Sequence, residues 1–136
     1  MILFDKSIFK EVISRICTDI ASNGTFTTDS NGRQLMKRKI NHRPTYEIDN
    51  HTEPISQNYY PITSIIQIED ENNEMVVITD RAQGGSSLQD GCIELMLHRR
   101  LLYIDSFGLS EALNEEAYGV GLVATGIGRV TLCLNR

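Results

Sequence analysis

Apolar and polar residues alternate along much of the chain with the period of a β-strand. Ile66 and Ile68 mark one alternating stretch in YYPITSIIQIED, and Ile93, Leu95 and Leu97 mark another in CIELMLHRRLL. A period of two places these side chains on one face of each strand. The patterns therefore predict strands that are buried on one face.

Other stretches predict β-structure from different signals. In EMVVITD the apolar residues fall on both faces, which predicts a strand buried on both sides. Two β-prone runs flank Asn31-Gly32, a pair that favours the positive φ angles of a type I′ hairpin turn. The stretch that begins at Asp29 lacks the alternating acidic residues and the later glutamate of a calcium loop, so we interpret it as a turn.

Two stretches carry helical signals. In FKEVISRICTDI, Val12, Ile16 and Ile20 recur at helical spacing, although the β-branched residues of the same stretch suit a strand. In LSEALNEE, Ser110 is a residue type that caps helices, and Glu115-Glu116 would lie on a solvated helix face. The second stretch predicts a short helix.

The remaining segments are connections and a glycine-broken tail. KINHRPTYEIDNHTEPISQ is polar, contains Pro44 and Pro54, and predicts a long surface connection. The tail GVGLVATGIGRVTLCLNR predicts one or two last strands. Many short strands separated by turn signals indicate a mainly β, antiparallel β-sandwich with at most one short helix, formed by residues 1–136 as one domain.

Composition and charge exclude several classes of protein. The chain has 136 residues, of which 40% are hydrophobic and 23% are charged, values typical of a globular domain. Its net charge of −5 provides no broad basic surface for nucleic acid. No apolar run approaches the ~20 residues that span a bilayer, and the first residues do not form the apolar core of a signal peptide. We therefore expect no nucleic-acid partner and no membrane span.

The cysteines and the sequons bear on the cellular compartment. Cys17, Cys92 and Cys133 lie far apart, and their odd number leaves at least one unpaired within the chain. We expect buried free thiols, since free cysteine packs as a small hydrophobe. Asn23-Gly24-Thr25 and Asn50-His51-Thr52 match the N-glycosylation pattern and favour a secretory route.

No motif in the chain predicts a self-contained active site. The loop QGGSS lacks the GxxxxGK[ST] and GxGxxG patterns, so we interpret it as a glycine-rich connection in a sheet, where the backbone turns or closely approaches another segment. There is no GxSxG, and His42, His51 and His98 form no HxH or HExxH pair, which argues against a zinc site built from this chain. These residues leave two hypotheses open: a carbohydrate-processing accessory domain and a protein-interaction module.

Four motifs occur in an order that resembles a known family. They are NGTFTTDSNGRQLMKR, HTEP with QNYYPITS, VITDRAQGGSSLQDGCIELMLHRRLL and FGLSEALNE. Together they are similar to the C-terminal β-rich region of the glycoside hydrolase family 38 α-mannosidases, of which the lysosomal type is most similar. The resemblance extends from about Lys10 to about Thr125, whereas residues 127–136 fit the family poorly and are expected to be a divergent tail.

The resemblance implies that the chain is a piece of a longer, glycosylated enzyme of the lysosome or secretory pathway. Such enzymes hydrolyse α-mannosidic bonds of N-glycans with retention, through an aspartate nucleophile and a second carboxylate. Their zinc ion and catalytic residues belong to an N-terminal domain that no part of this sequence matches. The resemblance therefore implies no catalytic or metal residue here, and a strand rather than a helix around residues 10–20.

The resemblance also implies roles for a few residues. In related Golgi-type enzymes an Arg-Gly pair reaches the sugar site, and the corresponding loop here places Phe107 where the arginine would stand, before Gly108. We therefore expect these two residues at the rim of the substrate site. Arg99 and Arg100 are expected in structural ion pairs, and the implied partners are the catalytic domain and a mannose oligosaccharide. The alternative is a non-catalytic carbohydrate-binding or protein-interaction β-sandwich.

Overall fold

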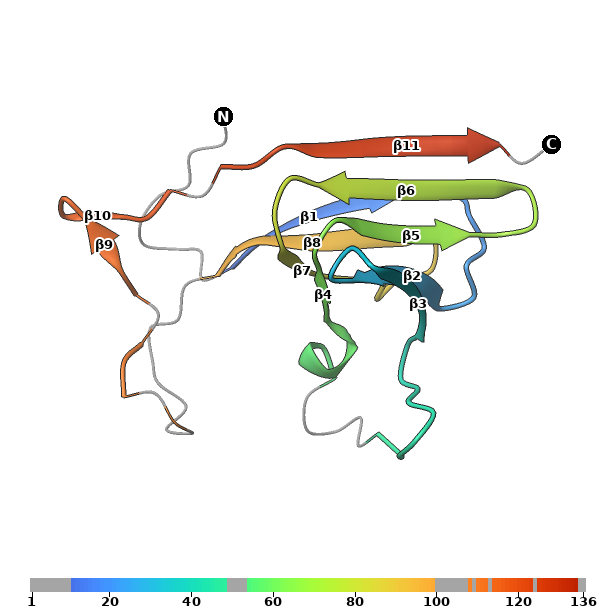
Figure 1. Cartoon of the computed structure of the whole chain (residues 1–136), viewed down its shortest axis with the longest axis horizontal. Helices are drawn as coiled ribbons and strands as arrows, with labels where there is room; N and C mark the ends of the chain where they lie inside the picture. The colour runs from blue at the N-terminus through green and yellow to red at the C-terminus, as the bar shows by residue number, and fades with distance from the viewer. Residues whose placement is uncertain are drawn as a thin grey trace.

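The chain folds into two antiparallel sheets that pack face to face, as Figure 1 shows. A computed structural model describes residues 11–48, 54–99, 108, 110–112, 114–123 and 125–134. The four-stranded sheet has the order β1 (Glu11–Cys17), β8 (Cys92–Arg99), β7 (Gln83–Ser86) and β4 (Tyr60–Ile62). The five-stranded sheet has the order β11 (Gly128–Leu134), β6 (Asn73–Thr79), β5 (Ile65–Glu69), β2 (Thr25–Ser30) and β3 (Gln34–Lys39). The predicted antiparallel sandwich is confirmed.

The core lies between the two sheets and comes from alternate residues of their strands. Ile66 and Ile68 of β5 pack in one cluster with Ile93 and Leu95 of β8, and the period of two places each pair on one face of its strand. Leu97, predicted on the same buried face as Ile93 and Leu95, is instead 43% exposed. Phe26 of β2 completes this layer and packs edge-on against the ring of Tyr60. The other fully buried apolar residues are Ile20, Ile62, Met75 and Val77.

The hairpin predicted at Asn31-Gly32 joins β2 to β3. Asn31 and Gly32 have φ angles of 51° and 67°, and the N–H of Arg33 donates to the carbonyl of Ser30 at 3.0 Å. Positive φ at both central residues is the signature of the predicted turn. A second tight turn joins β9 (Glu116–Ala117) to β10 (Val120–Gly121), a small hairpin drawn apart from the two sheets in Figure 1.

The structure decides between strand and helix at two segments. Residues 11–17 form β1, as the family resemblance implied and against their helical spacing, because β8 pairs with them along their full length. The short helix predicted in LSEALNEE is wrong: residues 110–112, 114 and 115 are not helical, and Glu116 begins β9. A short isolated helix is marginal without a packed apolar face, which explains this error. Among the described residues the one helical segment is a 3₁₀ turn at Ser56–Asn58.

The structure also corrects the predictions for EMVVITD and QGGSS. In β6, Met75 and Val77 are buried, but Ile78 on the opposite face is 42% exposed, so this strand is not buried on both sides. The first four residues of QGGSS, Gln83–Ser86, form strand β7 itself, so they are not a connection. The close approach expected there is confirmed, since a Cβ at Gly85 would lie 2.8 Å from Ile62 Cγ1 and 3.0 Å from Leu95 Cδ2.

The tail beyond residue 127 forms β11 at the edge of the five-stranded sheet. It pairs with β6 from Gly128 opposite Thr79 to Leu134 opposite Asn73. Val130 and Leu132 share the inner face of the sheet with Val77 but are 48% and 58% exposed. This edge strand therefore extends beyond the buried core, and the divergence of its sequence remains a prediction.

Candidate functional site

The predicted site residues are only partly within the described structure. Asn23 is exposed in the turn that precedes β2, with a φ of 53°. Gly108 is exposed with a φ of 144°, in open space. Arg99 ends β8 with its backbone opposite Glu11, whereas its side chain lies outside the described structure. Asn50, Arg100 and Phe107 lie outside it entirely, so their roles remain predictions.

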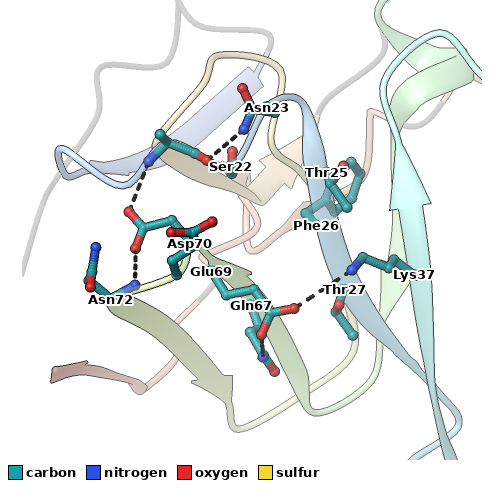
Figure 2. A pocket seen from close by; sticks show the side chains of 12 residues that line it. Ser22, Asn23, Thr25, Phe26, Thr27, Lys37, Gln67, Glu69, Asp70 and Asn72 are labelled. Atoms are coloured by element: carbon teal, nitrogen blue, oxygen red, sulfur yellow. Dashed lines mark hydrogen bonds and ion pairs between the residues drawn. The ribbon is translucent and has the colours of Figure 1, made fainter. Parts of the chain in front are cut away.

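A groove of about 600 Å³ opens beside Asn23, as Figure 2 shows. Its floor is the outer face of three neighbouring strands, where Lys37, Thr27 and Gln67 lie side by side in register. Its walls are the segment before β2 and the turn between β5 and β6. Thr25 and Glu69 continue the floor towards these walls, so the groove is lined mainly by polar side chains.

Asp70 ties the two walls of the groove together. Its Oδ2 accepts the backbone N–H of Ala21 at 3.2 Å, and its Oδ1 accepts those of Asn72 and Asn73, both at 2.8 Å. These last two bonds stabilise the carboxylate and lower the pKa of Asp70 below its usual value. A charged Asp70 therefore holds the turn between β5 and β6 against the segment that carries Asn23.

The floor of the groove offers polar groups that are not fully used within the protein. Gln67 Nε2 donates to Glu69 Oε2 at 3.3 Å, and Lys37 Nζ lies 3.8 Å from Glu69 Oε1. Among the described residues, no side chain or backbone group contacts the hydroxyls of Thr25 and Thr27 through a hydrogen bond. The groove thus presents hydroxyl and amide groups of the kind that bind sugars.

A second polar cluster lies on the outer face of the four-stranded sheet around Glu94. The Glu94 side chain is 3% exposed, and its Oε2 accepts from Arg15 Nη2 at 2.7 Å and Nε at 3.0 Å. Tyr59 donates its hydroxyl to the other oxygen. Sequence reasoning missed this cluster, although an acid inside the apolar run CIELML was a signal for it.

The cysteines contradict the expectation of buried free thiols. Cys17 and Cys92 form a disulfide between directly opposite positions of β1 and β8, with Cα atoms 4.1 Å apart. Cys133 is free and exposed on β11. The pairing was missed because 75 residues separate the two cysteines in sequence. A disulfide of this kind indicates an oxidising compartment.

The described residues do not supply a metal centre or a membrane helix. In the ranges that the structure covers, His, Cys, Asp and Glu side chains form no group of three that could hold a metal ion. Those ranges also include no helix long and apolar enough to cross a bilayer.

Fold and site together define a class of protein: a disulfide-bonded antiparallel β-sandwich whose notable surface feature is a polar groove. Comparison with known proteins narrows this class. The sequence profile described as "Glycosyl hydrolases family 38 C-terminal domain" matches residues 2–107. The chain belongs to this family, as its motifs predicted.

Individual relatives agree with the family match. The chain is 55% identical over 111 residues to "Lysosomal alpha-mannosidase" of Bos taurus, which covers 82% of this chain and 11% of the relative. It is 53% identical over 110 residues to the protein of the same name from Homo sapiens, a match that covers 81% of this chain and 11% of the relative. It is 44% identical over 112 residues to "Alpha-mannosidase" of Canavalia ensiformis, a match that covers 82% of this chain and 11% of the relative. The chain thus spans about a tenth of the length of these relatives.

Proposed function

We propose that this chain is part of a lysosomal-type α-mannosidase, in which it braces the catalytic domain. The observation that carries the proposal is the 55% identity to a lysosomal α-mannosidase over most of the chain. The reaction is the retaining removal of terminal α-linked mannose from N-glycans. A rigid, disulfide-bonded sandwich is suited to bracing because its strands are fixed by pairing and by a shared core.

The catalytic carboxylates and the zinc ion of such an enzyme would lie in a different domain. The described residues of this chain offer no ligand set that fits zinc, so no step of the reaction is assigned to zinc here. When bound elsewhere in the enzyme, zinc would supply Lewis-acid contact to the sugar hydroxyls. The partners of this chain are then the catalytic domain and the mannose oligosaccharide.

Within this proposal, the segment that follows β8 approaches the sugar site. Phe107 contributes an apolar ring for the sugar face, and Gly108 allows a close backbone approach. Arg99 and Arg100 act through ion pairs and packing and not through anion binding. The enzyme resides in the lysosome or secretory pathway, and Asn23 and Asn50 carry glycans, which the disulfide and the exposure of Asn23 support.

The proposal is tested with the intact protein that carries this chain, assayed on a mannose oligosaccharide. We expect hydrolysis that is lost on chelation and restored by zinc. Phe107→Ala should raise KM more than it lowers kcat, at an unchanged melting temperature, because the hydrolytic groups lie elsewhere. A protein that binds mannose oligosaccharides without hydrolysing them would instead support a carbohydrate-binding module. Unchanged kinetic constants and melting temperature in Phe107→Ala would exclude both a rim and a packing role for this residue.

A further inference from the structure

We propose that the groove beside Asn23 binds the first sugars of a glycan attached to Asn23 itself. The inference rests on the proposed glycosylation of this residue. Its ligand class is the N-acetylhexosamine-containing core of an N-linked glycan, held within the same molecule. The groove, the sequon and the unused polar groups of the floor are three separate observations that coincide at one end of the five-stranded sheet.

The position of Asn23 places an attached sugar beside the groove. Asn23 is exposed, it belongs to the rim of the groove, and its sequon partner Thr25 belongs to the floor. Figure 2 shows Asn23 at the start of the strand that carries Thr25 and Thr27. A volume of about 600 Å³ falls in the range of small-molecule sites, so the groove has room for more than one sugar ring.

The chemistry of the attachment leaves the local geometry intact. Asn23 Nδ2 donates to the carbonyl of Ala21 at 3.1 Å. In glycosylation, a bond forms between Nδ2 and the sugar C1 while the C1–O bond to a lipid pyrophosphate donor breaks. The amide loses one proton and the lipid pyrophosphate leaves. The amide retains one N–H, which suffices for the hydrogen bond to the carbonyl of Ala21. The anchored side chain can therefore keep the attached sugar beside the groove.

The floor of the groove suits a ligand rich in hydroxyl groups. Thr27 and Gln67 lie in one row, and Thr25 follows Thr27 by two residues on the same face. Each individual hydrogen bond to a sugar would be weak in water. Covalent attachment raises the effective concentration of the sugar at the groove, so a few such bonds are enough to hold it there.

The test uses the intact protein secreted from a eukaryotic host and follows enzymatic release of the Asn23 glycan under native conditions. Glycopeptide mass spectrometry gives the release rate at Asn23. The variant Thr27→Val with Gln67→Ala removes two floor contacts and keeps the sequon. We expect release about tenfold faster in this variant, the factor expected from losing two such hydrogen bonds. The matched control Gln34→Ala, a glutamine of β3 outside the groove, should release at the wild-type rate.

Each outcome decides the proposal. Equal release rates in the wild type and the double variant would overturn the proposal that the groove holds the glycan. A wild-type Asn23 that carries no glycan would also overturn it. If the double variant does not fold, Thr27→Val alone replaces it, because valine retains a β-branched side chain in β2. We expect a release rate between those of the wild type and the double variant. A release rate equal to that of the wild type would overturn the proposal. α-Mannosidase activity measured on the same preparations reports separately on the proposed function, so the two can fail independently.

Discussion

At the scale of single residues, Asp29 shows how one carboxylate joins two turns. Its side chain accepts the N–H of Gly32 at 2.7 Å from the β2–β3 turn. It also accepts the N–H groups of Thr63 and Ser64, which join β4 to β5, and of Ile65, which begins β5, at 2.9 to 3.1 Å. Asp29 is 4% exposed. Burial by itself raises the pKa of this carboxyl, but the four donors outweigh it and lower the pKa from 3.8 to about 2.

This lowered pKa predicts a specific loss of stability in acid. A carboxylate whose pKa is lower in the folded than in the unfolded state stabilises the fold above the unfolded pKa, and the effect is lost as the pH falls through the folded pKa. Asp29 should therefore contribute about 2 kcal/mol near neutral pH, and this should fade between about pH 4 and pH 2.

Urea unfolding of Asp29→Asn against the wild type, from pH 7 to pH 2, measures this contribution. The difference in free energy of unfolding should shrink towards the acid end of the range. The control Asp19→Asn, at an exposed aspartate, should change the free energy of unfolding little at any pH. If Asp29→Asn lowered the free energy of unfolding equally at every pH, the lowered pKa of Asp29 would not be the source of its contribution.

A second residue-scale prediction concerns the buried carboxylate of Glu94. Arg15 makes two hydrogen bonds to it, and the Arg15 side chain is about half exposed. Arg15→Met keeps the alkyl stem but leaves Glu94 with Tyr59 as its remaining partner in the described cluster, which should cost about 2–3 kcal/mol. Lys37→Met removes an exposed pair with Glu69 and should cost less than ~1 kcal/mol. Thermal unfolding of both variants measures their melting temperatures. Equal decreases in melting temperature would show that burial of Glu94 does not strengthen its interaction with Arg15.

At the scale of elements, the disulfide fixes the edge strand β1 to β8. It links residues 75 positions apart, so it removes many conformations of the unfolded chain. Cys17→Ser with Cys92→Ser should lower the free energy of unfolding by about 2–4 kcal/mol, and a reductant should have a similar effect on the wild type. Cys133→Ser, at the exposed free thiol, is the control and should leave stability unchanged. Chemical denaturation checks these effects, and a reductant-insensitive wild type would argue against the bond.

At the scale of the whole molecule, the proposal that the catalytic groups lie in a different domain predicts that the 136-residue chain alone is inactive. The described residues hold no metal-ligand cluster, and the relatives are about nine times longer than the matched segment. Purified chain should not hydrolyse an aryl α-mannoside with or without zinc. Turnover that depends on zinc and stops on chelation would place the chemistry within this chain and refute the proposal.

Local chemistry explains which features were predictable from the sequence. Alternation of apolar residues identified β5 and β8 because the pleat of a strand places every second side chain on one face. Asn31-Gly32 identified a turn because these residues tolerate positive φ. Where local signals conflicted, as in the helical spacing of residues 12–20, the pairing of β1 with β8 decided the outcome.

The sequence by itself determined the β class, several strands, the main hairpin and, through its motifs, the family. Only the tertiary structure decided which distant residues meet. The register of β1 against β8 brought Cys17 to Cys92 and Arg15 to Glu94. The joining of β2, β3 and β5 assembled the groove beside Asn23. The physical reason is that strand preference and turn geometry depend on neighbouring residues, whereas register depends on how both sheets bury their apolar faces together.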